Sequence, residues 1–105
     1  MSKLISKVEI EKFNNEGAVF LKNKFDIKWI EKLKKGVERD IKNPSPRFKS
    51  HTKKSNAPAY LEDYWTWDLV PEFKEFVYKS PYAEIASELM SAKKINLVMD
   101  NWFLR

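Results

Sequence analysis

The sequence of 105 residues contains no cysteine, two glycines and one histidine, and each shortage excludes a kind of site. Without cysteine, the chain can form neither disulfide bonds nor thiolate metal sites. Its two glycines, Gly17 and Gly36, lie too far apart to form a phosphate-binding loop. A single histidine, His51, cannot provide the two imidazoles that commonly hold catalytic zinc or non-haem iron. We interpret His51 as an exposed loop residue, and we expect no catalytic or metal-binding residues in this chain.

Long apolar runs are also missing. The opening MSKLISKVEIEK carries a charge every few residues, which is unlike a signal peptide or a membrane-spanning helix. Apolar residues make up 43% of the chain and charged residues 33%, a composition typical of a folded protein rather than a disordered one. We therefore expect residues 1–105 to form a single cytoplasmic domain with no membrane partner.

Positive charge is concentrated in residues 22–54, which contain twelve Lys or Arg and four acidic residues, although the net charge of the chain is +5. Such a segment is typical of a polyanion-binding surface and also of a lysine-rich helix in water. A group of aromatic residues follows it: Tyr60, Tyr64, Trp65 and Trp67. Aromatic rings can stack on the bases of single strands, but they also provide much of a small core. We favour a solvated helix face and core packing, and we keep a small basic module that binds nucleic acid or another polyanion as the alternative function.

The first helix is predicted by a capping box. Ser6 and Glu9 have the S-x-x-E spacing in which each side chain binds a backbone N–H at the helix start. Ile5 and Ile10 occupy the positions of a hydrophobic staple. Gly17 is expected to end this helix, because glycine readily adopts the left-handed conformation of a helix C-terminus.

An apolar run, AVFLK at residues 18–22, predicts a short strand after this helix. Asp26 can then cap a second helix, which should end before Pro44 because the residue before a proline avoids helical angles. One apolar stripe runs along this helix: Ile27, Ile30, Leu33, Val37 and Ile41.

The second half of the chain predicts a long loop, two helices and a strand. Residues 43–60 are rich in proline, serine and lysine and predict the long loop. Residues 62–70 predict a turn or a short strand. The helix PEFKEFVYK begins at Pro71, and the helix YAEIASELM follows the start signal Ser80-Pro81. Residues 95–104 predict a terminal strand whose two faces are both largely apolar near its start, as in a strand covered on both sides. Its polar residues, Asp100, Asn101 and Arg105, need partners unless they mark its solvent-exposed end.

The order of these elements resembles the N-terminal portion of the phytanoyl-CoA dioxygenase family. The matching segments are FNNEG at 13–17, WDLVPEF at 67–73, SPYAEIASELM at 80–90 and DNWFLR at 100–105. The first of these matches the F-x-x-x-G opening of the family. The family's SP…IA…L helix is matched by Ser80, Pro81, Ile85, Ala86 and Leu89.

The resemblance implies an α+β fold consisting of the N-terminal helices and first strands of a double-stranded β-helix (jelly-roll, cupin-like), with an incomplete barrel. A complete member would be an Fe(II)- and 2-oxoglutarate-dependent oxygenase. In the family, a basic residue at the end of the strand similar to residues 95–104 contacts 2-oxoglutarate, and Arg105 has that position. The family's iron is held by an H-x-D motif and a later histidine, and these 105 residues contain no H-x-D.

The resemblance therefore implies an N-terminal fragment or truncated member that is inactive alone, with Fe(II) and 2-oxoglutarate implied only for a complete protein. Because open strand edges invite pairing, we expect the C-terminal strand to pair with a complementing chain or with a second copy. A stand-alone interaction protein that keeps the scaffold without the activity is also compatible with this pattern. We do not expect nucleic acid to be the main partner.

Overall fold

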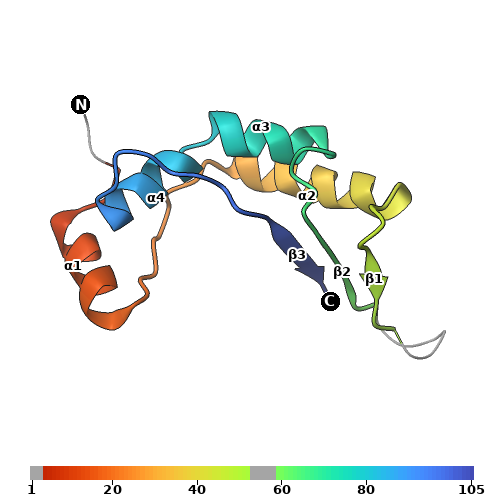
Figure 1. Ribbon diagram of the computed structural model, residues 1–105, viewed down its shortest axis with the longest axis horizontal. Coiled ribbons are helices and arrows are strands. Elements are labelled where there is room, and N and C mark those ends of the chain that lie inside the picture. Colours follow the sequence, from red (N-terminus) through yellow and green to blue (C-terminus); the bar gives the residue numbers. More distant parts are fainter. Residues whose placement is uncertain (1–3, 53–58) are drawn as a thin grey trace.

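The computed structural model describes residues 4–52 and 59–105, and it shows an α+β arrangement of helices beside a small antiparallel sheet (Figure 1). The described helices are α1 (Lys7–Glu16), α2 (Ile27–Lys42), α3 (Pro71–Lys79) and α4 (Tyr82–Met90). The described strands are β1 (Lys49–Ser50), β2 (Leu61–Tyr64) and β3 (Asn101–Leu104), in the sheet order β1-β2-β3. The predicted α+β class is confirmed.

Helix α1 has the predicted capping box. The Ser6 hydroxyl accepts a hydrogen bond from the Glu9 backbone N–H at 3.1 Å, and the Glu9 carboxylate accepts one from the Ser6 N–H at 2.8 Å. The helix ends at Gly17, whose φ of 81° is left-handed, as the sequence predicts. The Leu4 N–H donates to the Glu88 carboxylate and Ile5 is buried, so this N-terminal segment is attached to α4.

Replacing Ser6 with alanine is expected to lower the free energy of unfolding by about 1 kcal/mol, because the variant leaves a backbone N–H of the first turn without its acceptor. Urea denaturation measures the change. Lys12→Ala, an exposed substitution in the same helix, is the matched control and should differ little from the wild type. Equal stability of the Ser6→Ala variant and the wild type would contradict the role of the cap.

Helices α2 and α3 pack side by side through aromatic residues and a glycine. Trp29 of α2 is buried and meets the ring of Phe76 edge-on, with ring centroids 6.0 Å apart. Gly36 is buried against Phe73 of α3. The helix begins after Asp26 and ends before Pro44, as predicted.

The buried face of α2 differs from the predicted apolar stripe. Ile27 and Ile30 are exposed, whereas Trp29, Gly36 and Asp40 are buried. The large Trp29 ring packs inwards, and α3 approaches α2 closely at Gly36. Together they rotate the buried face of α2 away from the predicted apolar stripe.

Two ion pairs join the exposed rims of α2 and α3. The Arg39 guanidinium donates two hydrogen bonds to the Glu72 carboxylate, at 2.7 and 2.8 Å, and Lys32 pairs with Glu75 at 2.6 Å. Hydrogen bonding from these cations holds the pKa of each glutamate below its ordinary value. Pairs at such solvent-exposed positions contribute little to stability, so we attribute the attachment of α2 to α3 mainly to the aromatic packing.

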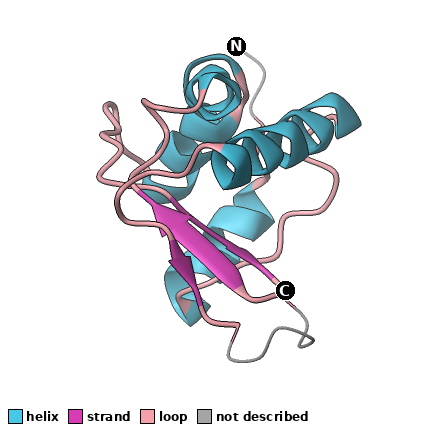
Figure 2. Cartoon of the chain, turned by 90° about the vertical axis from the view of Figure 1, so that its right-hand side faces the viewer, coloured by secondary structure: helices cyan, strands magenta, loops and turns pink. Residues whose placement is uncertain are grey.

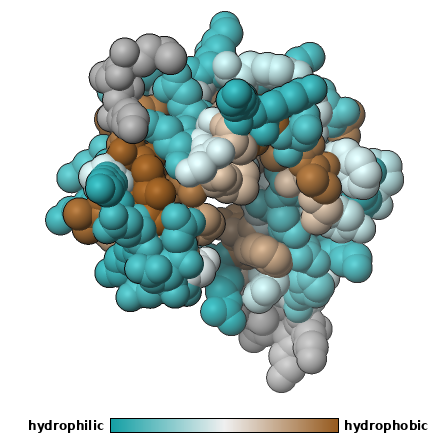
Figure 3. Space-filling model, turned by 60° about the vertical axis from the view of Figure 1, so that its left-hand side comes forward, coloured by the Kyte–Doolittle hydropathy of each residue, from teal (hydrophilic) through white to brown (hydrophobic). Residues whose placement is uncertain are grey.

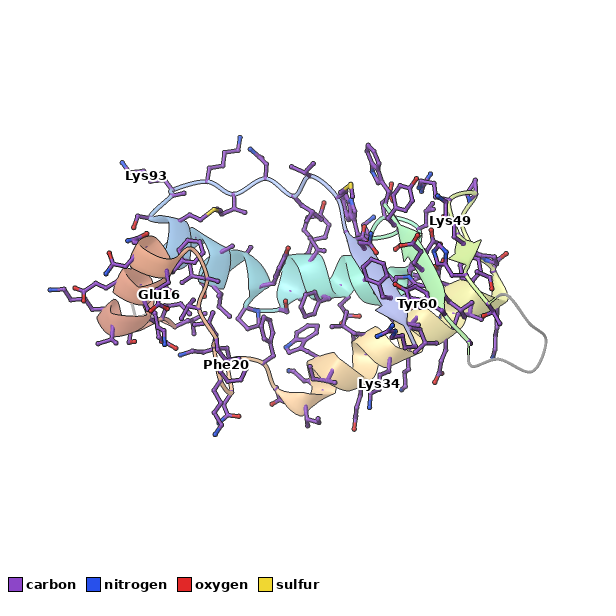
Figure 4. All side chains as sticks on the ribbon, turned by 90° about the horizontal axis from the view of Figure 1, so that it is seen from below. Glu16, Phe20, Lys34, Lys49, Tyr60 and Lys93 are labelled. Atoms are coloured by element: carbon purple, nitrogen blue, oxygen red, sulfur yellow. The ribbon has the colours of Figure 1, made fainter. Side chains whose placement is uncertain are left out.

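Two predictions of local structure are wrong, and the predicted 43–60 loop is irregular in its described residues except for β1. Residues 18–22 form no strand, and Phe20 is 83% exposed in an extended connection (Figure 4). This connection runs near α1, at the end of the molecule away from the sheet, so it has no strand to pair with (Figure 1). The terminal strand begins only at Asn101, because β2 reaches no further along it. The predicted 43–60 loop contains β1, which pairs with β2; its residues 53–58 lie outside the described residues.

The molecule is longer and more open than a compact domain of its size. Its dimensions are 49 × 27 × 25 Å and its radius of gyration is 16.2 Å, whereas about 13 Å is typical of 100 residues. Its accessible surface is 8295 Å², compared with about 6200 Å² for a compact protein of this mass. Figure 2 views the molecule from the sheet end, where the three strands lie side by side. Large apolar side chains are among the exposed residues, including Val8, Phe20, Tyr78 and Val98.

Candidate functional site: an open sheet edge and an apolar groove

The outer edge of β3 is the first component of the candidate site. β3 pairs with β2 in the register Leu61↔Leu104 to Tyr64↔Asn101, and no strand within residues 4–52 and 59–105 pairs with its other edge. The Trp65 N–H donates to the Asp100 carbonyl at 2.9 Å. Because bonded and non-bonded pairs alternate along an antiparallel ladder, the backbone groups of residues 101 and 103 point towards the open edge. They form a template for another strand.

Apolar side chains near this edge are exposed. Val98 is 82% exposed and Phe103 60%, and Met99 and Leu104 are exposed as well. The expectation that both faces of this strand are covered is wrong for the described residues, because no second layer lies over it. Figure 3 shows apolar side chains at the surface of another face of the molecule, beside a deep hollow. Clustered exposed apolar residues mark interaction sites.

A groove runs between the segment preceding β3 and helices α3 and α4. Two adjoining cavities of about 390 and 640 Å³ form it, and volumes of this order are typical of ligand pockets. Both cavities are lined by the same central residues, Trp67, Val77, Tyr82, Leu97 and Met99. The lining is mainly apolar and aromatic, so the groove is suited to apolar side chains or an apolar ligand.

Asp100 anchors β3 to the turn after β2. Its carboxylate accepts hydrogen bonds from the Thr66 N–H at 2.9 Å, the Thr66 hydroxyl at 2.7 Å and the Trp67 N–H at 3.0 Å. Trp65 in this turn has a left-handed backbone with φ of 58°, a strained conformation for a bulky residue. Arg47 donates to the carbonyl oxygen of Trp65 at 2.7 Å and helps to hold the turn. The prediction that Asp100 needs partners is confirmed.

Two buried carboxyl groups face each other between α2 and the sheet. Asp63 of β2 is 0% exposed and accepts from the Ser45 hydroxyl at 2.6 Å, the Ser45 N–H and the Tyr64 N–H. Asp40 of α2 is 2% exposed and accepts from the Trp102 indole N–H at 3.1 Å. Burial, together with the neighbouring Asp63 carboxylate, raises the pKa of Asp40 to about 7. Burial alone would raise the pKa of Asp63, but hydrogen bonds from Asp40 and Ser45 lower it.

Arg105 lies at the end of β3, where its guanidinium is 5.4 Å from the centroid of the Tyr60 ring. Tyr60 also meets the ring of His51 edge-on, and His51 Nε2 lies 3.0 Å from a Glu62 carboxylate oxygen. His51 is exposed, as predicted. Figure 4 labels Tyr60 close to β3. The contact of Arg105 with 2-oxoglutarate stays a prediction.

The four predicted aromatic residues do not form one cluster. Trp67 packs against Tyr78 with centroids 5.9 Å apart, Tyr64 lies beneath Arg47, and Trp65 is exposed. None of the four is fully buried, so core packing explains them only in part. The buried apolar core is formed instead by Ile5, Trp29, Val70, Phe73 and Ile85.

The basic segment is partly neutralised by acids from other parts of the chain. Lys24 pairs with Glu9 at 3.2 Å, and the pairs of α2 with α3 involve two more of its cations. Lys34 projects away from α2 (Figure 4), and residues 53 and 54 lie outside the described residues. No arrangement of the described residues specifically favours polyanion binding over a solvated helix face.

The residues of this chain do not fit an iron centre. In residues 4–52 and 59–105, no three His, Cys, Asp or Glu side chains form a group able to hold a metal ion, and the chain has one imidazole in all. We therefore derive no catalytic step through iron or 2-oxoglutarate. None of the described helices has the length and apolar character needed to cross a bilayer.

Sequence reasoning missed the carboxyl pair and the buried Thr66. One signal was present for Asp40, since it lies three helical turns after Trp29 and therefore on the same helix face. No comparable signal marks Asp63, because its burial depends on how β2 meets α2. Comparisons with models of protein families, with curated proteins and with solved structures found no match.

Proposed function

We propose that this chain is the N-terminal portion of an Fe(II)- and 2-oxoglutarate-dependent oxygenase similar to the phytanoyl-CoA dioxygenase family. It provides the outer helices and the first strands on which the rest of a double-stranded β-helix assembles, and it has no oxygenase activity alone. The observation that carries the proposal is the open edge of β3 beside the apolar groove.

The size of the uncovered surface supports this proposal. The chain exposes about 2000 Å² more than a compact protein of its mass, and a stable protein interface buries about 800 Å² per partner. Such a surplus is large enough for extensive contact with further strands. A barrel strand paired with the outer edge of β3 would also cover Phe103 and fill the groove.

The anchoring of β3 gives further support. The Asp100 carboxylate fixes the start of β3 through the turn after β2, so the open edge is held in a defined place before any partner arrives. A pre-ordered edge lowers the entropy that is lost on pairing. By the resemblance, Arg105 would contact 2-oxoglutarate in a complete protein.

The proposed family predicts two results. The genomic reading frame that follows the Arg105 codon should encode an H-x-D motif shortly downstream and a second histidine later. A frame lacking these ligands would contradict the proposal.

The purified 105-residue chain with added Fe(II) should not decarboxylate 2-oxoglutarate, and turnover that stops when Fe(II) is chelated would also contradict the proposal.

The open edge predicts that the isolated chain self-associates when no complementing segment is present. Light scattering coupled to size exclusion should show a mass that grows with concentration. Phe103→Pro is expected to abolish this growth, because proline removes the N–H that points to the open edge while leaving the pairs with β2 intact. Phe103→Ala is the matched control, since it removes the ring and keeps the N–H. A wild-type chain that stays monomeric at all concentrations would contradict the role of the edge.

A further inference from the structure

The carboxyl groups of Asp40 and Asp63 lie together in the interior, an arrangement that is stable if one of the two carries a proton. Both side chains are almost completely buried, and Trp102, whose indole N–H donates to Asp40, is the residue directly opposite Asp63 in the β2–β3 pairing. Two negative charges brought together in this buried position repel each other strongly. Asp63 accepts hydrogen bonds from three groups of Ser45 and Tyr64, as an ionised carboxylate does. Asp40 accepts one from the Trp102 indole, which leaves its second oxygen able to carry a proton towards Asp63.

We propose that Asp40 and Asp63 share a single proton, and that this proton holds helix α2 on the sheet and keeps β3 seated through Trp102. The Asp40 O–H then donates to the Asp63 carboxylate, and the other Asp40 oxygen accepts from Trp102. Loss of the proton places two carboxylates against each other and pushes the C-terminal half of α2 away from β2. The inference does not depend on the proposed function, because it concerns only contacts within this chain.

Three secondary-structure elements meet around Asp40, and their charged groups set its environment. β2 contributes Asp63, and the start of β3 contributes Asp100, whose negative charge also disfavours ionisation of Asp40. α3 packs against α2 at Gly36, one turn before Asp40, and its Glu72 carboxylate there is engaged by Arg39. The acidic neighbours therefore all oppose a second negative charge at Asp40.

The sign of the pH dependence follows from the direction of the shift. The pKa of Asp40 in the folded state lies above its unfolded value, so the folded chain binds an extra proton between about pH 4 and pH 7. The contribution of Asp40 to the free energy of unfolding is therefore largest at the acidic end of this range. It is lost as the pH rises towards 7. Because the folded state binds one proton more than the unfolded state in this range, the equilibrium constant for unfolding rises about tenfold per pH unit. Above about pH 7 both states have lost the proton, and the constant reaches a plateau.

Asp40→Asn should remove this pH dependence. An asparagine can donate its N–H to Asp63 and accept from Trp102 at every pH, so urea midpoints of this variant should be nearly constant from pH 5 to pH 8. Asp68→Asn, the same substitution at an exposed position, should keep the wild-type slope. Asp63→Asn should lower the urea midpoint at pH 5, because the Asp40 O–H then loses the carboxylate to which it donates a hydrogen bond.

A second measurement follows the titration in the wild-type chain itself. In ¹³C NMR spectra of the wild-type chain, one aspartate carboxyl should titrate near pH 7, together with a shift of one tryptophan indole N–H. The indole is assigned to Trp102 by its loss in Trp102→Phe, and the carboxyl by its loss in Asp40→Asn or, if that variant does not fold, by its coupling to the Asp40 methylene protons. Titration of every aspartate below pH 5, or an unchanged slope in Asp40→Asn, would overturn the proposal.

Discussion

Replacing Asp100 with alanine is expected to lower the free energy of unfolding by about 3 kcal/mol, because the variant leaves buried donors without an acceptor. The wild-type carboxylate binds two N–H groups and the hydroxyl of Thr66, which is 0% exposed. Because Thr66 is fully buried, its N–H and hydroxyl cannot reach water when the carboxylate is removed. Urea denaturation at pH 7 measures the loss, and ¹⁵N NMR should show that the amide signals of Thr66 and Trp67 move most.

Asp68→Ala is the matched control for this prediction, since it removes an aspartate of the same turn that is exposed to solvent. It should change stability by less than about 0.5 kcal/mol. Asp100→Asn should fall between the two, because its single oxygen can satisfy only part of the donor set. If Asp100→Ala and Asp68→Ala are equally mild, Asp100 does not anchor β3.

The second large effect is expected for Gly36→Leu. A Cβ at this position would lie 2.5 Å from Cε1 and 2.8 Å from Cδ1 of Phe73, closer than side chains can approach. Leucine is a good helix former, so a loss of stability has to come from the forced separation of α2 and α3. We expect the free energy of unfolding to fall by about 3 kcal/mol, the upper range for overpacked cores.

Lys35→Leu places the same side chain at the exposed neighbouring position and should be close to neutral. A double-mutant cycle gives the sharper test. Phe73→Ala removes the ring that the new side chain meets, so Gly36→Leu should destabilise the Phe73→Ala background less than the wild type. Additive effects of the two changes would show that the ring does not limit the approach of the helices.

The predicted helices were correct because their signals are local. The capping box at Ser6 and Glu9 and the left-handed residue Gly17 form α1 through contacts within a few residues. Pro44 and Pro71 act in the same way, because a proline restricts the backbone beside it whatever lies around it. The need of Asp100 for partners was also predictable, since a carboxylate between apolar residues has to be satisfied.

The predicted strands were less accurate, because a strand needs a neighbour that the sequence does not identify. Residues 18–22 are as apolar as β3, yet they remain unpaired because they run beside α1 at the far end of the molecule (Figure 1). Residues 95–99 likewise run beside α3 and α4 instead of pairing with β2. Composition and spacing correctly indicated that these segments are apolar and extended. They carry no information about which other segment each one lies beside in the fold.

The amino-acid sequence by itself determined where the helices begin and end, that the chain lacks the ligands of an iron centre, and that its last residues favour an extended form. Only the tertiary structure decided which face of α2 is buried, that β3 has one open edge, and that Asp40 meets Asp63. The physical reason is the range of the interactions. Caps and prolines act over a few residues, whereas the approach of α3 to Gly36 and the meeting of two carboxyl groups depend on segments brought together by the fold.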